Sequence, residues 1–502
     1  MTDHLILLPV LLHLFFAILL IFLWKEPLWK RIVSIAGNSF IMAASIHLFI
    51  KTWNSGILTT QAGSWPAPFG ITFVADVFSS LMVLLTSAAG LAVSVFSAVG
   101  VSEARIKYGY FPILHFLLMG LSGAFLTGDI FNLYVWFEII IISSFVLLTL
   151  GGREKQIGGG IKYVTLNMVA SVIFLTAIAI LYGLTGSLNM AHLSQKVAAV
   201  ENRGLINVAA MLFFVGFGIK SAVFPLYFWL PASYHTPPSA IAAVFGGLLT
   251  KVGIYAILRI FTLIFIPDEF MLKMFTFVAV ATLLTGAFGA IVRKDIRKMF
   301  SYLIVCHIGY LIGGLSLFTE LALTGVLFYL VHDIIVKTNI FLVTGVIYKI
   351  RGSVKYQESG GLYAAYPKIS LLVAVVLFSL VGVPPLSGFW PKIFLVQEAL
   401  MVGSYALLAA IIAASLVTLL VIARLWSEVF WKNRPEINQV GDAFAPLTRS
   451  KKTMLVAPVI FLALITLYIG FGAENILKVS RHIAGELINT SPYVKAVLGA
   501  GS

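Results

Sequence analysis

Long apolar stretches, interrupted by short polar segments, make up most of the chain. A helix crosses the hydrocarbon core of a bilayer with about 20 apolar residues, and stretches of that length recur along the sequence. Ten-residue segments of alternating polarity are absent, so the pattern predicts spanning helices rather than a barrel. We expect about fourteen spans, at 4–23, 30–50, 72–99, 109–126, 129–150, 160–184, 205–230, 237–262, 272–292, 298–318, 322–348, 369–396, 402–430 and 452–472.

The composition agrees with the bilayer as the main solvent. Of the 502 residues, 60% are hydrophobic and 11% are charged, and the mean hydropathy is +1.01. A soluble domain carries roughly a quarter charged residues, so these charges could not cover a water-facing surface. We predict one all-α polytopic membrane domain. The residues before Leu5 hold no basic segment and no cleavage site follows, so the first stretch is predicted to be a retained helix.

Basic residues gather in alternate loops. The formal net charge is +14, but its position between apolar stretches favours control of membrane topology over nucleic-acid binding. By the positive-inside rule the richer loops are cytoplasmic and both termini lie outside. The richer loops hold Lys25, Lys30, Arg31, Arg105, Lys107, Arg153, Lys155, Lys162, Arg293, Lys294, Arg297, Lys298, Lys349, Arg351, Lys355, Lys368, Lys432, Arg434, Arg449, Lys451 and Lys452. The opposite loops and the tail hold Lys51, Lys196, Arg203, Lys273, Lys478, Arg481 and Lys495.

The segment after Gly472 is amphipathic. Its apolar residues are separated by charged ones, and they are Ile476, Leu477, Val479, Ile483 and Leu487. Such a segment is typical of a helix that lies in the membrane interface. We therefore predict that this tail rests on the membrane surface.

Several charged side chains lie within the predicted spans. Arg259 and Arg424 are near span ends, where a long side chain can reach the interface, and are interpreted as structural. The deeper basic residues are Lys220, Lys251, Lys337 and Lys392, the acidic ones are Glu138 and Asp333, and His307 and His332 accompany them. The lone histidines His47 and His115 are interpreted as core or interface residues.

Buried charges of this kind indicate proton transfer. A charge at the bilayer centre costs about 2.5–3.5 kcal/mol even on the lenient insertion scale, so these lysines need a shared polar interior. Burial disfavours the charged form, which leaves each group able to gain or lose a proton. We hypothesise that Glu138 holds Lys220 protonated. Interhelical ion pairs that only fix packing remain the alternative for any single lysine, and both alternatives stay open for His307 and His332.

Two spans contain prolines where a helix would be continuous. The stretches are GIKSAVFPLYFWLP, with Pro225 after Lys220, and GVPPLSGFWPK, with Pro384, Pro385 and Gly388 before Lys392. Proline removes a backbone donor and clashes with the preceding turn, so each helix should break. Broken helices at corresponding places are typical of inverted-repeat transporters. The expected divisions are 1–108, two five-helix repeats at 109–262 and 263–430, and a last helix with its tail at 431–502.

The sequence lacks the motifs of several other functions. It has no GxxxxGK[ST] phosphate loop, no HExxH motif, and a single cysteine, Cys306, so ATP hydrolysis, a zinc site and an iron–sulfur cluster are not expected. The glycine run at 158–160 is not in a strand–helix unit, which argues against dinucleotide binding. No cofactor is predicted.

The stretches around these charges resemble a known family. They are GDIFNLYVWFE, KSAVFPLYFWLPASYHTPPSAIAAVFGGLLTKVGIYAILR, DIRKMFSYLIVCHIGY, HDIIVKTNIFLVTG and GVPPLSGFWPK. They are similar to the antiporter-like subunits shared by respiratory complex I and the Mrp-type multisubunit cation/proton antiporters. The resemblance runs from about Asp76 to Trp431. The second and fourth stretches are more similar in sequence to the D-type branch of the Mrp-type antiporters than to the complex I members.

The resemblance implies roles for particular residues. Glu138 matches the fifth-helix glutamate of the family, Lys220 and Lys251 match the seventh- and eighth-helix lysines, and Lys337 and Lys392 match those of the eleventh and twelfth helices. It also implies a hydrated chain of these groups across the middle of the membrane. Many complex I members have histidine where this chain has Asp333, with His332 one position earlier, and this departure alters the relay at that point.

The function implied is that of a non-enzymatic subunit of a hetero-oligomeric Na⁺/H⁺ antiporter in the cytoplasmic membrane of a prokaryote. Its expected partners are the other membrane subunits, H⁺, Na⁺ and the lipid bilayer, with K⁺ or Li⁺ as cations left open. The alternative is a proton-pumping subunit of a complex I-like NADH:quinone oxidoreductase or a membrane-bound hydrogenase. A third possibility, a scaffold that does not transport, does not account for buried lysines.

Overall fold

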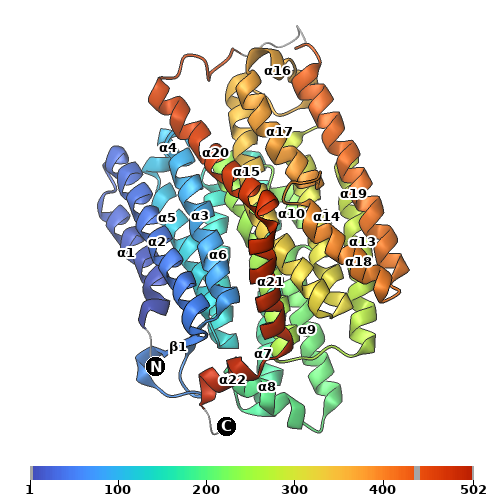
Figure 1. Ribbon diagram of the computed structural model, residues 1–502. Helices are drawn as coiled ribbons and strands as arrows, with labels where there is room; N and C mark the ends of the chain where they lie inside the picture. The colour runs from blue at the N-terminus through green and yellow to red at the C-terminus, as the bar shows by residue number, and fades with distance from the viewer. Residues whose placement is uncertain (1–3, 435–440, 500–502) are drawn as a thin grey trace.

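The chain folds into a bundle of long helices, most of which run along one common axis (Figure 1). The computed structural model describes residues 4–434 and 441–499. Within them, twelve helices are long and apolar enough to cross a membrane, and two shorter apolar helices, α5 and α17, bring the set to the predicted number. We call the end of the bundle near α4 and α16 the upper end, and the end near β1, α8 and α22 the lower end (Figure 1).

The helices that form the spans share lengths of roughly three to nine turns. They are α1 (Leu8–Phe22, after a 3₁₀ turn at His4–Leu7), α2 (Pro27–Ser55), α3 (Val77–Gly100), α5 (Tyr110–Leu126), α6 (Ile130–Thr149), α7 (Glu154–Thr185), α9 (Arg203–Ser221), α11 and α12 (Ser239–Val244 and Thr250–Leu263, joined by a π-helical turn at Phe245–Leu249), α13 (Glu269–Ile291), α14 (Ile296–Leu317), α15 (Glu320–Arg351), α17 (Pro367–Val381), α19 (Tyr405–Trp426, continued by a π-helical turn at Ser427–Trp431) and α20 (Arg449–Phe471).

Shorter elements join these spans. They are α4 (Glu103–Lys107), α8 (Met190–Ala199), α10 (Trp229–Ser233), α16 (Leu362–Ala365), α18 (Phe389–Met401), α21 (Ala473–Ile488), α22 (Ser491–Leu498), 3₁₀ turns at Ala62–Ser64 and Tyr356–Glu358, and the strands β1 (Leu58–Gln61) and β2 (Thr72–Ala75).

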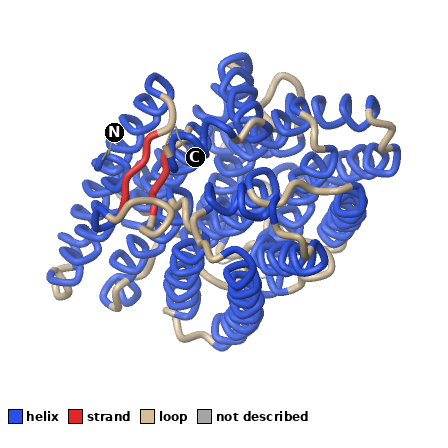
Figure 2. Tube along the Cα trace, turned by 90° about the horizontal axis from the view of Figure 1, so that it is seen from below, coloured by secondary structure: helices blue, strands red, loops and turns tan. Residues whose placement is uncertain are grey.

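The start of the third span differs from the prediction of 72–99. Residues 72–75 form β2, which pairs antiparallel with β1 so that Leu58 faces Ala75, and α3 begins only at Val77. The hairpin lies at the lower end of the bundle (Figure 2). Asp76 ends the strand and caps α3, because its carboxylate accepts the backbone N–H of Ser79 while the Ser79 hydroxyl accepts the N–H of Asp76. The prediction placed the start of the helix too early, because the strand residues just before α3 are also largely apolar.

The helices from α5 to α12, here the first half, and from α13 to α19, the second half, repeat several local features. Both α7 and α15 have 32 residues. Asp129 caps α6 and Asp295 caps α14 in the same way. Each aspartate also forms an isolated antiparallel bridge, Asp129 with Asn189 and Asp295 with Lys355. The division into two inverted repeats stays a prediction, which these correspondences support.

Two spans are interrupted at their prolines. The seventh consists of α9 and the short α10, and the twelfth of α17 and α18. The backbone turns left-handed at Ala222 and Gly382, directly after the upstream helix of each pair. Pro225, Pro384 and Pro385 are exposed on the outer side of the turns. The turns therefore present their prolines to the outside of the bundle.

The C-terminal helices do not lie flat. The helix α20 crosses the bundle obliquely, and α21 continues from it toward the lower end (Figure 1). The apolar face of α21 packs against α15, with Ile483, Ala484 and Leu487 buried. The prediction that this tail rests on the membrane surface is therefore wrong for the described residues, because the apolar face is covered by protein and not by lipid.

Candidate functional site

A buried ion pair joins the two halves. The ammonium of Lys251, on α12, lies 2.8 Å from an oxygen of Asp333, on α15, and both side chains are fully buried. The other carboxylate oxygen of Asp333 lies 2.9 Å from Nδ1 of His307, on α14. One carboxylate therefore holds a lysine of the first half and a histidine of the second.

The backbone positions Lys251 through an irregular turn. The π-helical turn at Phe245–Leu249 shifts the hydrogen-bond pattern of the eighth span directly before this lysine. The carbonyl of Gly246 accepts a hydrogen bond of 2.7 Å from the Lys251 ammonium. Single π-turns are frequent at functional sites, and here the turn supplies a carbonyl partner to a buried charge.

Lys337 lies one helical turn beyond Asp333 on α15. Its side chain is fully buried, and its ammonium has no hydrogen-bond partner within the described part of the chain. A buried ammonium without a partner costs several kcal/mol, whereas a neutral amine costs far less. This lysine can therefore lose its proton more readily than a lysine held by a carboxylate.

A third group lies at the break in the twelfth span. Nδ1 of His332, on α15, is 2.8 Å from the hydroxyl of Ser387, in the turn between α17 and α18. Lys392, on the first turn of α18, donates a hydrogen bond of 2.7 Å to the carbonyl of Val381, the last residue of α17. The break thus provides the carbonyl that holds this lysine. Gly388 leaves room for the ring of His332, since a Cβ there would lie 3.0 Å from it.

Aromatic rings fill the space between these groups. Tyr310 stacks on Tyr329, and both pack edge-on to the ring of His307. Tyr329 also contacts His332, and the Lys392 ammonium lies 5.2 Å from the ring centre of Tyr310. The second half therefore gathers His307, His332 and Lys392 around one tyrosine pair. Sequence reasoning missed these tyrosines because aromatic residues are common in apolar helices.

The predicted pairing of Glu138 with Lys220 is absent. The Lys220 ammonium donates to the hydroxyl of Ser171 at 3.1 Å and lies 4.7 Å from the ring centre of Phe137. Glu138 is half-buried, and one of its oxygens is buried without a hydrogen-bond partner in the described residues. No ion pair joins the two side chains there, although Glu138 lies close enough to act on Lys220 electrostatically.

A small cavity lies beside Lys220. It is lined by Tyr163, Asn167, Lys220, Trp229, Tyr234 and apolar residues of α6 and α12. Its volume of about 10 Å³ is close to the space that one water molecule needs by the same measure. Trp229 fixes the break beside it, because its indole N–H donates to the carbonyl of Ile219. The cavity lies between Lys220 and the α12 helix that carries Lys251.

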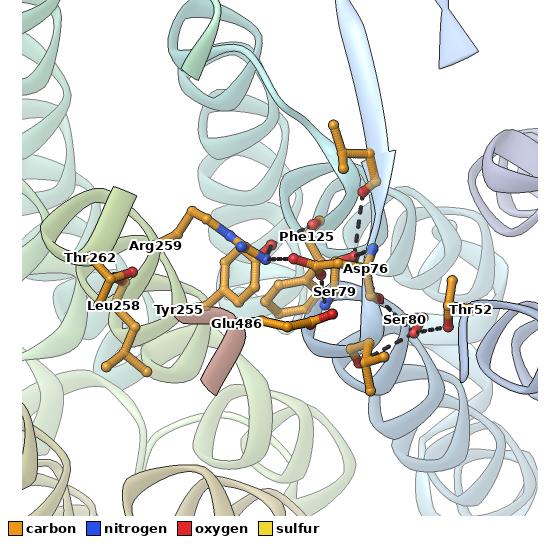
Figure 3. Close-up of polar contacts among 12 residues, drawn as sticks. Thr52, Asp76, Ser79, Ser80, Phe125, Tyr255, Leu258, Arg259, Thr262 and Glu486 are labelled. Atoms are coloured by element: carbon orange, nitrogen blue, oxygen red, sulfur yellow. Dashed lines mark hydrogen bonds and ion pairs between the residues drawn. The ribbon is translucent and has the colours of Figure 1, made fainter. Parts of the chain in front are cut away.

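A second buried ion pair was not expected. Arg259, interpreted from sequence as reaching the interface, is buried on α12 and lies 2.5 Å from the carboxylate of Asp76 (Figure 3). The hydroxyl of Tyr255 is 3.4 Å from the guanidinium and itself donates to the carbonyl of Phe125. The position of Arg259 near the end of its span concealed this pair, because the end of the span is covered by other parts of the chain.

Other buried polar residues have structural partners. His115 lies between His13 and Ser34, with contacts of 3.1 Å to each, as its interpretation as a core residue predicts. Lys30, counted from sequence among the loop residues, is buried and donates to the carbonyls of Ile106 and Lys107 at the end of α4. The Lys30 ammonium therefore satisfies carbonyls at the end of α4 and does not belong to the central groups.

These groups can exchange protons, and their arrangement does not resemble a metal centre. Among the described residues, no group of three or more histidine, cysteine, aspartate or glutamate side chains is placed to hold a metal ion. The central group instead consists of one acid, Asp333, among lysines and histidines of α12, α14, α15 and α18. Since Asp333 is shared, a proton gained or lost at Lys251 or His307 changes how strongly the carboxylate holds the other.

The chain is similar to known proteins in both sequence and fold. The family model described as "NADH:quinone oxidoreductase/Mrp antiporter, TM" matches residues 127–418. The D-type component of the Na⁺/H⁺ antiporter of Alkalihalophilus pseudofirmus is 38% identical over 497 residues, which cover 99% of each chain. A chain of the Mrp complex from Dietzia sp. DQ12-45-1b superposes with a TM-score of 0.91 at 29% identity, over 99% of this chain and 100% of that one. A chain of an archaeal membrane-bound sulfane sulfur reductase superposes with a TM-score of 0.90 at 25% identity, over 99% and 100%.

Proposed function

The chain belongs to the NADH:quinone oxidoreductase/Mrp antiporter family of membrane proteins, and from that premise we propose that it is a subunit of a hetero-oligomeric Na⁺/H⁺ antiporter and conducts protons. The observation that carries the proposal is the buried pair of Lys251 and Asp333, with Lys337 left unpartnered one turn away among the described residues. Groups that only fix packing would be paired, whereas a relay needs a base that is free to take a proton.

The proposed relay runs through both halves. Glu138 and Lys220 receive the proton in the first half, and the cavity beside Lys220 is bordered by Val252, the neighbour of Lys251 on α12. Lys251 passes it across the shared carboxylate of Asp333 to the second half, where Lys337 is the next base. From there the groups at the twelfth-span break carry it to the outlet, namely His307, His332 and Lys392. The gaps between these side chains are bridged by water, as in other proton paths.

The partners follow from what this chain provides. We propose that protons cross within it and that the cation crosses where other membrane subunits of the complex contribute oxygen ligands. Sodium is the proposed cation because the relative from Alkalihalophilus pseudofirmus is named as part of a Na⁺/H⁺ antiporter. At 100 mV each net charge moved is worth about 2.3 kcal/mol, so the membrane potential drives the exchange if more protons enter than cations leave.

We also propose an orientation. The upper end holds α4, which carries Arg105 and Lys107. Lys294 and Lys298 line the same pocket as Arg105, so this basic end faces the cytoplasm of a prokaryotic cell. The lower end, where the described chain starts and finishes, then faces outside. The terminal residues 1–3 and 500–502 themselves lie outside the described residues.

The test is cation/proton exchange by the assembled complex. The chain and the other subunits are expressed in bacteria that lack their own Na⁺/H⁺ antiporters, and everted vesicles are acidified by respiration. Adding Na⁺, K⁺ or Li⁺ should collapse the pH gradient, most strongly with Na⁺. Lys337→Ala should lower the exchange rate about 100-fold or more, the range of a lost acid–base group. Exchange at the wild-type rate by an assembled Lys337→Ala complex would disprove the relay.

Two controls sharpen the result. Lys273→Ala removes an exposed lysine paired only with Glu269 on α13 and should leave exchange unchanged. The redox-driven alternative is tested by purifying the complex in mild detergent from its native membrane. Small membrane subunits without flavin or iron absorbance support the antiporter, whereas co-purified flavin and iron–sulfur proteins would make the chain part of a redox-driven pump.

A further inference from the structure

A polar route at the lower end is not used by the relay described above. Three residues lie on one face of α12 at four-residue spacing, namely Lys251, Tyr255 and Arg259. The first belongs to the central pair and the last to the buried pair with Asp76. Eight residues of helix cover about 12 Å, so one helix face connects the centre of the bundle to its lower part.

The C-terminal helix brings a second carboxylate to this place. Glu486, on α21, points from that helix toward the Asp76 end of α3 (Figure 3). One oxygen of Glu486 is 3.4 Å from Nε2 of His482, and the other is buried without a hydrogen-bond partner in the described residues. A well-built structural carboxylate would have both oxygens satisfied.

The same glutamate borders a surface pocket. The pocket has a volume of about 530 Å³, and the residues that line it include Glu474, His482 and Glu486. The Glu486 side chain is 22% exposed. It therefore stands between solvent in the pocket and the buried pair of Arg259 and Asp76.

We propose that Glu486 is the proton-exchange residue of an outer access route, and that the Arg259–Asp76 pair is its gate. The proposal rests on the proposed function, since it assigns the path by which the relay reaches the lower side. Arg259 is paired with Asp76, and the charge of Glu486 acts on both of these groups through space. When Glu486 is protonated, Arg259 stays on Asp76. When Glu486 is ionised, its negative charge competes with Asp76 for Arg259 and draws the guanidinium away from the passage along Tyr255.

The chemistry is proton transfer alone. The Glu486 carboxylate takes a proton from a hydronium ion in the pocket, whose O–H bond breaks as the carboxyl O–H bond forms and which is left as water. The neutral acid then gives that proton to water on the inner side, which passes it along Tyr255 to Lys251 once that lysine has given its own proton to the second half, and the carboxylate is restored. No electron or other group moves. The reverse sequence releases a proton to the pocket.

The surroundings favour exchange near neutral pH. Burial, followed by the Asp76 carboxylate, raises the pKa of the Glu486 carboxyl to about 7, and the Arg259 guanidinium opposes them. Because the pKa is raised, the carboxyl stays protonated below about pH 7 and is ionised above it. The groups around it are His482 on the same helix, Asp76 on α3, Arg259 and Tyr255 on α12, and Tyr493 on α22, whose ring lies against Arg259.

The experiment compares two glutamates of α21 in the assembled complex. Glu486→Gln should lower Na⁺/H⁺ exchange in everted vesicles about tenfold or more and remove the inflection of the pH profile near 7. Glu486→Asp should restore part of the rate, with a shifted profile. Glu474→Gln changes another acid that lines the pocket and should keep the wild-type rate and profile.

A second measurement does not depend on transport. Infrared difference spectra of the purified complex between pH 6 and pH 8 should contain a protonated-carboxyl band that Glu486→Gln removes and Glu474→Gln keeps. A wild-type rate and pH profile in Glu486→Gln, with Lys337→Ala inactive, would overturn the access route and leave the proposed function intact. Loss of the exchange in every chain, including the wild type, would instead reject the proposed function. An unchanged infrared band in Glu486→Gln overturns the route in either case.

Discussion

Asp333 offers the sharpest test at the scale of single residues. Its two oxygens hold Lys251 and His307, and all three side chains are fully buried. We expect Asp333→Leu to destabilise the folded protein by about 3–5 kcal/mol, because it leaves the Lys251 charge buried without its partner. Thermal unfolding of the detergent-purified chain would measure this loss.

The double variant separates lost pairing from lost packing. Lys251→Met combined with Asp333→Leu removes both charges, so it should recover much of the stability that either single change loses. Simply additive losses would mean that the two residues do not interact as a pair. Transport should be absent from all three variants, because the bridge between the halves is lost in each.

Residue types could be predicted from the sequence better than their partners. Every deep lysine stood out as a charge in an apolar stretch, and the structure places Lys251, Lys337 and Lys392 near one another around α15. The predicted pairing of Glu138 with Lys220 was wrong, and its absence could not be foreseen because Ser171, on a different helix, accepts the hydrogen bond of the ammonium. The prediction that Arg259 reaches the membrane interface was wrong, because the position of a residue within a span does not tell which other parts of the chain cover the end of that span.

At the scale of elements, the break in the twelfth span depends on a close approach. A Cβ on Gly388 would lie 2.2 Å from the carbonyl oxygen of Ser379 and 3.0 Å from the ring of His332. Gly388→Ala should therefore push α18 away from α17, cost about 1–3 kcal/mol and reduce exchange. Gly183→Ala, on α7, is the matched control, because nothing lies within 4 Å of its Cβ position. Equal melting temperatures for the two variants would contradict the tight contact.

Hydrophobicity predicted the bounds of an element well where a helix is surrounded on all sides by lipid or by the apolar core. They failed at β2, whose apolar residues 72–75 are as hydrophobic as the helix that follows. The predicted repeat is also visible in the positions of residues along α7 and α15, although the residue types at those positions differ. Asn167 and Asp333 stand thirteen residues after the starts of α7 and α15, and Ser171 and Lys337 seventeen residues after them. The charged members occur only in the second half.

At the scale of the whole molecule, the proposed orientation can be tested by labelling. Cys306 is fully buried, so it should be inert to a membrane-impermeant maleimide, and Cys306→Ala provides a clean background. In intact cells the reagent should modify Glu201→Cys, near α8 at the lower end, and should not modify Lys107→Cys at the upper end. The opposite pattern would place the basic loops outside the cell.

The number of spans was predictable, but the course of the last helices was not. An amphipathic segment suits a membrane surface and a groove in a bundle equally well, because both cover one apolar face. Only the packing of α21 on α15 distinguishes the two, and this packing brings Glu486 to Asp76. The lower access route therefore depends on a contact between segments about 400 residues apart, which no local pattern can predict.

The shared carboxylate of Asp333 also sets how the two halves contribute to the rate. A single negative charge serves Lys251 in one half and His307 in the other. In the proposed relay the two halves are therefore connected in series and not in parallel. A change that stops either half must then stop the whole throughput and cannot leave half of it. Slowing one half makes it the rate-limiting step, after which further damage to the other half has little effect.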